Sequence, residues 1–134
     1  MKEKLKETLL KIGFSEIDAS DLSVSIIILS LKQVLENLLD KEDFDKLDQE
    51  IQNKNYEVLN TLIQKVDKDK FQIEMAERIK QNLIETMDVI FNEVPEELKQ
   101  GFVEILSEIK TSEFVDKLKN SNEKIEDVLK NIAQ

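Results

Sequence analysis

The sequence contains no cysteine, no histidine and no tryptophan, and it has a single proline and two glycines among 134 residues. Without cysteine the chain cannot form disulfides, thiolate zinc sites, iron–sulfur clusters or a cysteine nucleophile. Without histidine it lacks the commonest general base and the commonest transition-metal ligand. Most enzyme and metalloprotein types are therefore excluded, and we expect no cofactor, no metal site and no catalytic residue.

Nucleotide-binding and calcium-binding motifs are also missing. The two glycines, Gly13 and Gly101, cannot build a phosphate-binding loop, and neither the P-loop nor the dinucleotide-binding fingerprint occurs. The acidic residues between Glu36 and Glu50 do not follow the spacing of a calcium loop, which needs a glycine at its sixth position and a glutamate at its twelfth. They are more simply a solvated helix surface. We therefore expect a protein without enzymatic activity.

Acidic residues outnumber basic residues in both halves of the sequence. The chain has 29 Asp and Glu against 19 Lys and Arg, a formal net charge of −10, and the excess divides evenly between residues 1–67 and 68–134. A nucleic-acid-binding surface needs a cationic stripe, whereas this field repels phosphates, so direct nucleic-acid binding is not expected. No apolar run is long enough to span a membrane and no secretory leader is recognisable, which favours a cytoplasmic location.

The composition predicts α-helix over nearly the whole chain. Proline and glycine are rare, while Leu, Ile, Lys, Glu and Gln recur with apolar residues three and four positions apart. We predict an all-α fold, a compact bundle of about eight helices joined by short turns. The predicted helices cover residues 2–12, 21–39, 41–52, 56–66, 69–93, 95–109, 112–118 and 125–132.

We expect residues 1–134 to form a single helical domain. The place where the chain could divide is near Pro95, which would separate residues 1–94 from residues 95–134. The glycine and serine enrichment that marks a flexible linker is missing there. One compact body is therefore favoured.

Residues 21–39 contain the most hydrophobic stretch of the sequence. The run from Ile26 to Leu29 is nearly continuous in β-branched residues, and by propensity alone it could be a buried strand. The apolar period continues through Leu39, however, and no second strand candidate exists to pair with it. A helix that is apolar on nearly all sides needs neighbours on nearly all sides, so we place this helix at the centre of the bundle.

Three residues are candidates for contact with a partner: Tyr56, Met75 and Met87. The two methionines lie on the apolar seam of the long helix predicted over residues 69–93, and their spacing is that of a core. The alternative is an exposed groove or a self-association seam, because a 25-residue helix is about 37 Å long and overhangs a domain of this size. Tyr56 opens the fourth predicted helix, either as a half-buried residue or as a partner contact.

The order of features over residues 1–90 is also informative. Leu35–Leu39 leads into Asp40–Phe44, a polar break follows, a short helix ends in Leu62–Val66, and Asp67–Phe71 opens a long charged helix. In this order of hydrophobic segments and loops the chain resembles a family of small acidic helical bacterial proteins of unknown function. The resemblance implies an intracellular bacterial helical domain, and it assigns no catalytic or binding residue.

Three functions are compatible with these observations. The leading hypothesis is a non-enzymatic protein–protein interaction or self-assembly module, which buries an apolar helix face against a partner protein or a second copy of itself, with acidic residues at the rim. The first alternative is an acidic inhibitor that mimics nucleic acid and occupies the basic groove of a DNA- or RNA-handling protein, although interspersed lysines dilute the single-sign surface that a mimic needs. The second alternative is a small enzyme or ligand carrier with a pocket that sequence does not reveal.

The sequence predicts that Ile27 and Leu29 are both inaccessible to solvent. Replacing either residue by Asp is expected to unfold the domain, because an unpaired buried carboxylate costs several kcal/mol of a total stability of about 5–15 kcal/mol. Circular dichroism of the two variants measures this. A soluble and fully helical variant that changes from oligomer to monomer would place the run at an interface instead.

Overall fold

The computed structural model describes residues 1–55, 57–123, 125, 127 and 128. Within these residues the chain forms seven α-helices and no strand, which confirms the all-α prediction. The helices are α1 (Lys2–Ile12), α2 (Glu16–Leu38), α3 (Lys41–Gln52), α4 (Glu57–Ile63), α5 (Lys68–Phe91), α6 (Glu96–Ile109) and α7 (Ser112–Lys119). The eighth predicted helix, residues 125–132, lies largely outside the described residues. None of the described helices combines the length and hydrophobicity that crossing a membrane requires.

The helix boundaries follow from side-chain caps. Gly13 ends α1 in the left-handed conformation, with φ +117°, which glycine adopts at little steric cost. The side chain of Ser15 accepts a hydrogen bond from the Asp18 backbone N–H at 3.2 Å, so α2 begins at Glu16 and not at Asp21 as predicted. The same kind of cap at Asp40 and Asp67 starts α3 and α5 close to where the sequence placed them.

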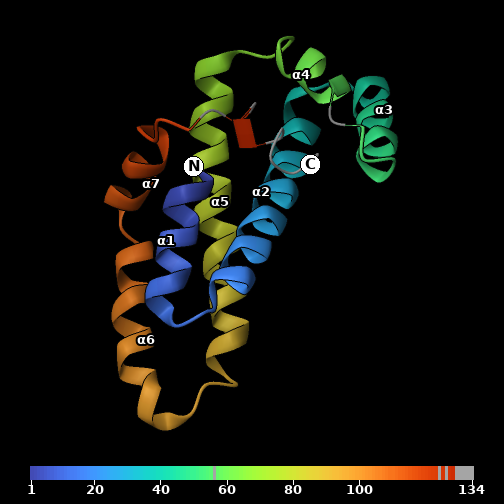
Figure 1. Cartoon of the computed structure of the whole chain (residues 1–134). Helices are drawn as coiled ribbons and strands as arrows, with labels where there is room; N and C mark the ends of the chain where they lie inside the picture. The colour runs from blue at the N-terminus through green and yellow to red at the C-terminus, as the bar shows by residue number, and fades with distance from the viewer. Residues whose placement is uncertain (56, 124, 126, 129–134) are drawn as a thin grey trace.

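An antiparallel pair of long helices, α2 and α5, forms the centre of the bundle (Figure 1). The helix α1 packs on α2, while α6 and α7 pack on α5, and α6 also contacts α1. The short helices α3 and α4 pack on each other, and α3 contacts α2. The two central helices also contribute most of the largest fully buried side chains. They include Ile27, Leu31, Leu35, Met75, Ile79, Leu83 and Met87.

The predicted burial of the whole Ile26–Leu29 run is wrong at one position. Ile26 and Ile27 are buried, with 3% and 0% exposure, and Ile28 is half-buried, but Leu29 is 48% exposed. Successive residues of a helix point about 100° apart, so four consecutive side chains cannot all face the same neighbours. The helix α2 packs against α1, α5 and α3, and Leu29 lies on the side that these helices leave to solvent.

The interface between α2 and α5 contains a buried polar cluster. Asn82 Nδ2 on α5 donates hydrogen bonds to Ser30 Oγ at 2.8 Å and to Gln33 Oε1 at 2.9 Å, both on α2. Ser30 Oγ donates in turn to the backbone carbonyl of Ile26 at 2.7 Å. Because a buried amide without partners is costly, these bonds favour a single axial position and rotation of α5 on α2.

The start of α1 is joined to the residues that follow α7. The carboxylate of Glu123 accepts a hydrogen bond from the Glu3 backbone N–H at 3.0 Å and lies 3.6 Å from the Met1 amino group. That amino group also donates to Ser121 Oγ. Burial lowers the pKa of the Met1 amino group from its usual value, while the Glu123 carboxylate acts in the opposite direction. These contacts hold the start of α1 close to the end of α7.

The burial pattern makes Ile27→Asp and Leu29→Asp a matched pair of variants. Ile27→Asp is expected to unfold the protein, because Ile27 is fully buried and no cation faces it among the core residues that surround it. Leu29→Asp is expected to cost at most about 1 kcal/mol, mainly through the lower helix propensity of Asp. Urea unfolding followed by circular dichroism distinguishes them. Equal loss of stability in the two variants would contradict this placement of α2.

Candidate functional site

Exposed apolar side chains gather at one end of the molecule. Figure 1 shows that α5 and α6 project beyond the turn that joins α1 to α2. Among the described residues seven large apolar side chains are exposed, and five of them lie on α6, on the last turns of α5 or beside the α1–α2 turn. We call these five the apolar end. They are Leu10 (42% exposed), Ile17 (74%), Val89 (67%), Leu98 (62%) and Val103 (48%).

The apolar end is supported by an aromatic pair. The ring centroids of Phe91 on α5 and Phe102 on α6 are 5.8 Å apart with a tilt of 46°, and Phe102 is only 6% exposed. The Lys99 ammonium lies 5.2 Å from the Phe91 ring centroid and 2.9 Å from the Glu96 carboxylate. These contacts hold the projecting parts of α5 and α6 together. Leu98 and Val103 therefore lie on a supported helix surface.

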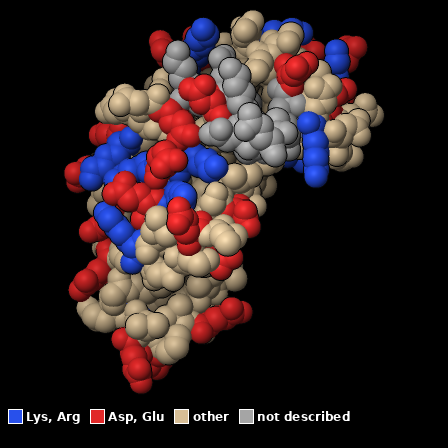
Figure 2. Space-filling model, in the orientation of Figure 1, with Lys and Arg blue, Asp and Glu red and all other residues tan. Residues whose placement is uncertain are grey.

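Most of the net negative charge is concentrated around the apolar end. The two segments that form this end, residues 13–24 and 85–104, contain nine acidic residues and one basic residue, Lys99, which is a net charge of −8 out of −10. Figure 2 shows the same division on one face: the lower end carries only acidic and uncharged residues, and the lysines lie higher. Four of the five apolar side chains, all except Leu10, thus lie in segments whose charge is almost entirely negative.

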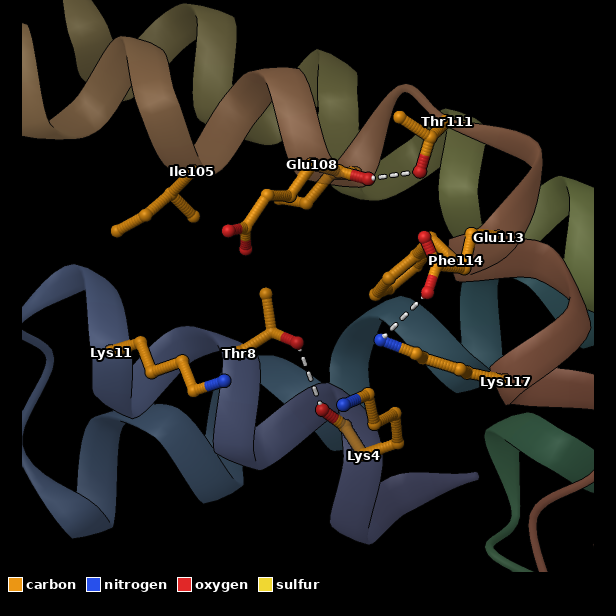
Figure 3. A pocket seen from close by; sticks show the side chains of 10 residues that line it. Lys4, Thr8, Lys11, Ile105, Glu108, Thr111, Glu113, Phe114 and Lys117 are labelled. Carbon is orange, nitrogen blue, oxygen red and sulfur yellow. Dashed lines mark hydrogen bonds and ion pairs between the residues drawn. The ribbon is translucent and has the colours of Figure 1, made fainter.

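A pocket of about 360 Å³ lies away from this end, between α1, α6 and α7 (Figure 3). Three lysines line it: Lys4 and Lys11 from α1 and Lys117 from α7. The Glu108 carboxylate points into the pocket from α6, on the opposite wall. The apolar part of the lining includes Ile109 and Phe114, together with Ile105. The pocket therefore joins cationic, anionic and apolar surface in one hollow.

The hydroxyl groups that line the pocket already have backbone partners. Thr8 Oγ1 donates to the Lys4 carbonyl at 3.0 Å, and Thr111 Oγ1 donates to the Glu108 carbonyl at 2.7 Å. Neither threonine is arranged as an activated nucleophile. The hydroxyl of an activated nucleophile donates its proton to a general base, whereas these two hydroxyls donate to backbone carbonyls. The arrangement is suited to holding charged groups in place and shows no nucleophile–base pair.

The structure places Met75 and Met87 inside the protein. Both methionines have 0% exposure, which is the core packing that their spacing favours. Neither side chain is on the surface, so the alternative of a partner contact at Met75 or Met87 does not fit their burial. Tyr56, the third predicted contact, lies outside the described residues. The predicted overhang of the long helix is present, but it exposes Val89, which follows Met87 by two residues and points about 200° away from it.

The sequence reasoning did not identify Leu98 or Val103. Leu98 has the spacing of the buried side of α6, four residues before Phe102, and it is exposed because this end of α6 lies beyond the α1–α2 turn. Val103 lies about 140° around the helix from Leu98, on a different side of α6. Among the described residues no group of three acidic side chains is arranged to hold a metal ion.

Comparison of the chain with protein-family models, with curated proteins and with solved structures finds no match. The resemblance of residues 1–90 to small acidic helical bacterial proteins therefore remains a prediction. The chain's own residues carry the functional proposal below.

The exposure of Leu98 predicts that it contributes little to folding. Leu98→Gln is expected to change the free energy of unfolding by less than about 0.5 kcal/mol, as is typical of surface positions. Phe102→Ala, four residues along the same helix, is expected to cost about 3 kcal/mol because Phe102 is buried against Phe91. Urea unfolding measures both values. A large loss of stability in Leu98→Gln would mean that this side chain serves the fold.

Proposed function

We propose that this protein is a non-enzymatic interaction module that binds a basic partner protein through its apolar end. The observation that carries the proposal is the position of four exposed aliphatic side chains, Ile17, Val89, Leu98 and Val103, within the segments that hold most of the net charge. Single exposed apolar residues are normal on any protein surface, but several at one end with charged residues around them are typical of interaction sites.

The aliphatic side chains would supply the binding free energy. Burying a fully exposed Val, Leu or Ile side chain contributes about 1.5–3 kcal/mol, so side chains that are already partly buried offer about 1 kcal/mol each. Ile17, Val89 and Leu98 are the most exposed and have the most surface to lose. Their positions at helix ends next to a supported aromatic pair keep them in place before binding, which lowers the entropy cost of association.

The carboxylates around them would select the partner. Charges at the rim of an interface contribute mainly to orientation, association rate and rejection of wrong partners. Segments with nine acids and one lysine attract a partner segment rich in Lys and Arg. It also opposes the pairing of two such ends, so we favour a different protein over a second copy of this chain. The expected partner is a basic segment with apolar side chains along one side.

The alternative function, an acidic inhibitor that mimics nucleic acid, would draw its binding free energy from carboxylates and not from aliphatic side chains. A nucleic-acid mimic binds through rows of carboxylates that stand in for phosphates, and it has no need of exposed aliphatic side chains. Its binding would disappear at moderate salt, because interactions between exposed charges are screened within about 10 Å at 0.1 M salt. Binding that survives salt and depends on Ile17 and Leu98 would favour the interaction module.

Substitutions at the apolar end are expected to weaken the capture of a partner protein from an extract of the source cells. The double variant Ile17→Gln/Leu98→Gln removes apolar surface without changing the charge, and it is expected to weaken capture at least about tenfold. Ile73→Gln is the matched control, because Ile73 is 43% exposed but lies on the first turns of α5, at the opposite end. The captured protein is identified by mass spectrometry and is expected to present a basic segment.

Two results would contradict the proposal. One is a partner whose capture is equally strong with the double variant and with Ile73→Gln. The other is a concentration-dependent dimer in light scattering that the double variant dissociates, since this would make the apolar end a self-assembly surface. The expected result in light scattering is a monomer of 15.6 kDa.

A further inference from the structure

We propose that the pocket between α1, α6 and α7 binds a small zwitterion with an aliphatic group, such as a free α-amino acid of about the size of leucine. The pocket volume of about 360 Å³ is within the range of small-molecule sites, about 300–1,000 Å³. The proposal concerns a different surface from the apolar end, and its basis is the distribution of charge across the pocket.

One side of the pocket has an excess of positive charge. The ammonium groups of Lys4 and Lys11 lie 4.0 Å and 3.8 Å from the two carboxylate oxygens of Glu7, so two cations share one anion. Lys117 lies 3.5 Å from Glu113. Three lysines therefore face two carboxylates on this side, which leaves one positive charge to attract the carboxylate of a ligand.

The opposite wall has an excess of negative charge. The Glu108 carboxylate extends from α6 toward α1, and the structure shows no ion pair for it within the described residues. In Figure 3 the amino groups of Lys4 and Lys117 lie at the other end of the pocket, where Lys117 is paired with Glu113, while the amino group of Lys11 lies across from the Glu108 carboxylate. A ligand that carries a carboxylate at one end and an ammonium group at the other matches both walls, whereas a simple anion would meet Glu108 as a like charge.

The lining of the pocket also has an apolar part. Ile109 and Phe114 are 1% and 6% exposed, and Ile105 is half-buried on the same helix as Ile109. An aliphatic side chain placed against these residues would be removed from water while the charged groups stay near the rim. The three parts of the lining thus correspond to the three parts of an aliphatic amino acid.

Two other hollows of the described chain are less suited to such a ligand. One that adjoins this pocket, lined by Lys4, Lys6, Lys117, Glu3 and Glu7, is more open and has only Leu10 as apolar lining. Another, at the α2–α5 groove, includes Arg78 with Glu74 and Glu77 and has only Val34 as apolar lining. Neither of these two hollows combines facing opposite charges with an apolar lining of several residues.

The test titrates L-leucine into the isotope-labelled protein and follows the backbone amide resonances by NMR. Saturable shifts are expected for residues 4–11 and 105–117. Two analogues of leucine that each lack one charged group test the two charged contacts separately. 4-Methylpentanoate lacks the ammonium group, and 3-methylbutylamine lacks the carboxylate. Each is expected to bind about tenfold more weakly than leucine, since each loses one charge-assisted contact.

Variants assign the contacts to residues. Glu108→Gln is expected to weaken leucine binding about tenfold and to leave 4-methylpentanoate no weaker, while Lys117→Gln weakens both. Glu104→Gln, on the same helix but outside the pocket lining, is the matched control and should bind leucine like the original chain. All of these positions are at the surface, so the variants are expected to fold.

Three outcomes would overturn the proposal. The first is the absence of saturable shifts with leucine at millimolar concentration. The second is binding of 4-methylpentanoate as tightly as leucine, which would make the pocket a site for anions alone. The third is an equal affinity for leucine in Glu108→Gln and Glu104→Gln.

Discussion

The packing of α2 against α5 is the interaction on which the rest of the structure depends. These helices have 23 and 24 residues, roughly twice the length of α1 and α6 taken on average, and they contribute most of the fully buried side chains. Hydrophobic burial alone permits neighbouring helices to slide past one another, because one aliphatic contact can replace another. Asn82 restricts this freedom, since both hydrogens of its side-chain amide have partners on α2, Ser30 and Gln33. One register of the pair satisfies this buried amide.

The positions of both surface features follow from that register and from helix length. At 1.5 Å per residue α5 is about 36 Å long, whereas α1 is about 16 Å long and covers only part of its side of the bundle. The ends of α5 and α6 are therefore left without cover beyond the α1–α2 turn, which exposes Val89 and Leu98. Where α1 does reach, it stops short of full contact with α6 and α7, and the pocket lined by Lys4, Glu108 and Lys117 lies in the space between them.

Local chemistry made much of the fold predictable. The caps at Asp40 and Asp67, the left-handed Gly13 and the spacing of apolar residues depend on neighbours within one or two turns, so the sequence alone indicates them.

The exposure of individual side chains was harder to predict, because it depends on which helix lies opposite. Leu29 and Leu98 have the spacing of core residues on their helices but are exposed, while Met75 and Met87, with the same kind of spacing, are enclosed. The concentration of negative charge at one end could not be predicted for the same reason. Residues 13–24 and 85–104 are far apart in sequence, and the antiparallel pairing of α2 with α5 brings them to one end.

Native-state hydrogen exchange, measured residue by residue, tests most directly whether the α2–α5 pair is the structural centre. Amides that open only with the whole protein exchange with the free energy of global unfolding, and locally opening segments exchange with less. The account predicts that amides in residues 27–35 of α2 and 79–87 of α5 share one exchange free energy, equal to that of global unfolding. Amides of α6 in residues 98–104 should exchange through smaller openings. The account is contradicted if α6 is protected as strongly as the central pair, or if α2 and α5 exchange with clearly different free energies.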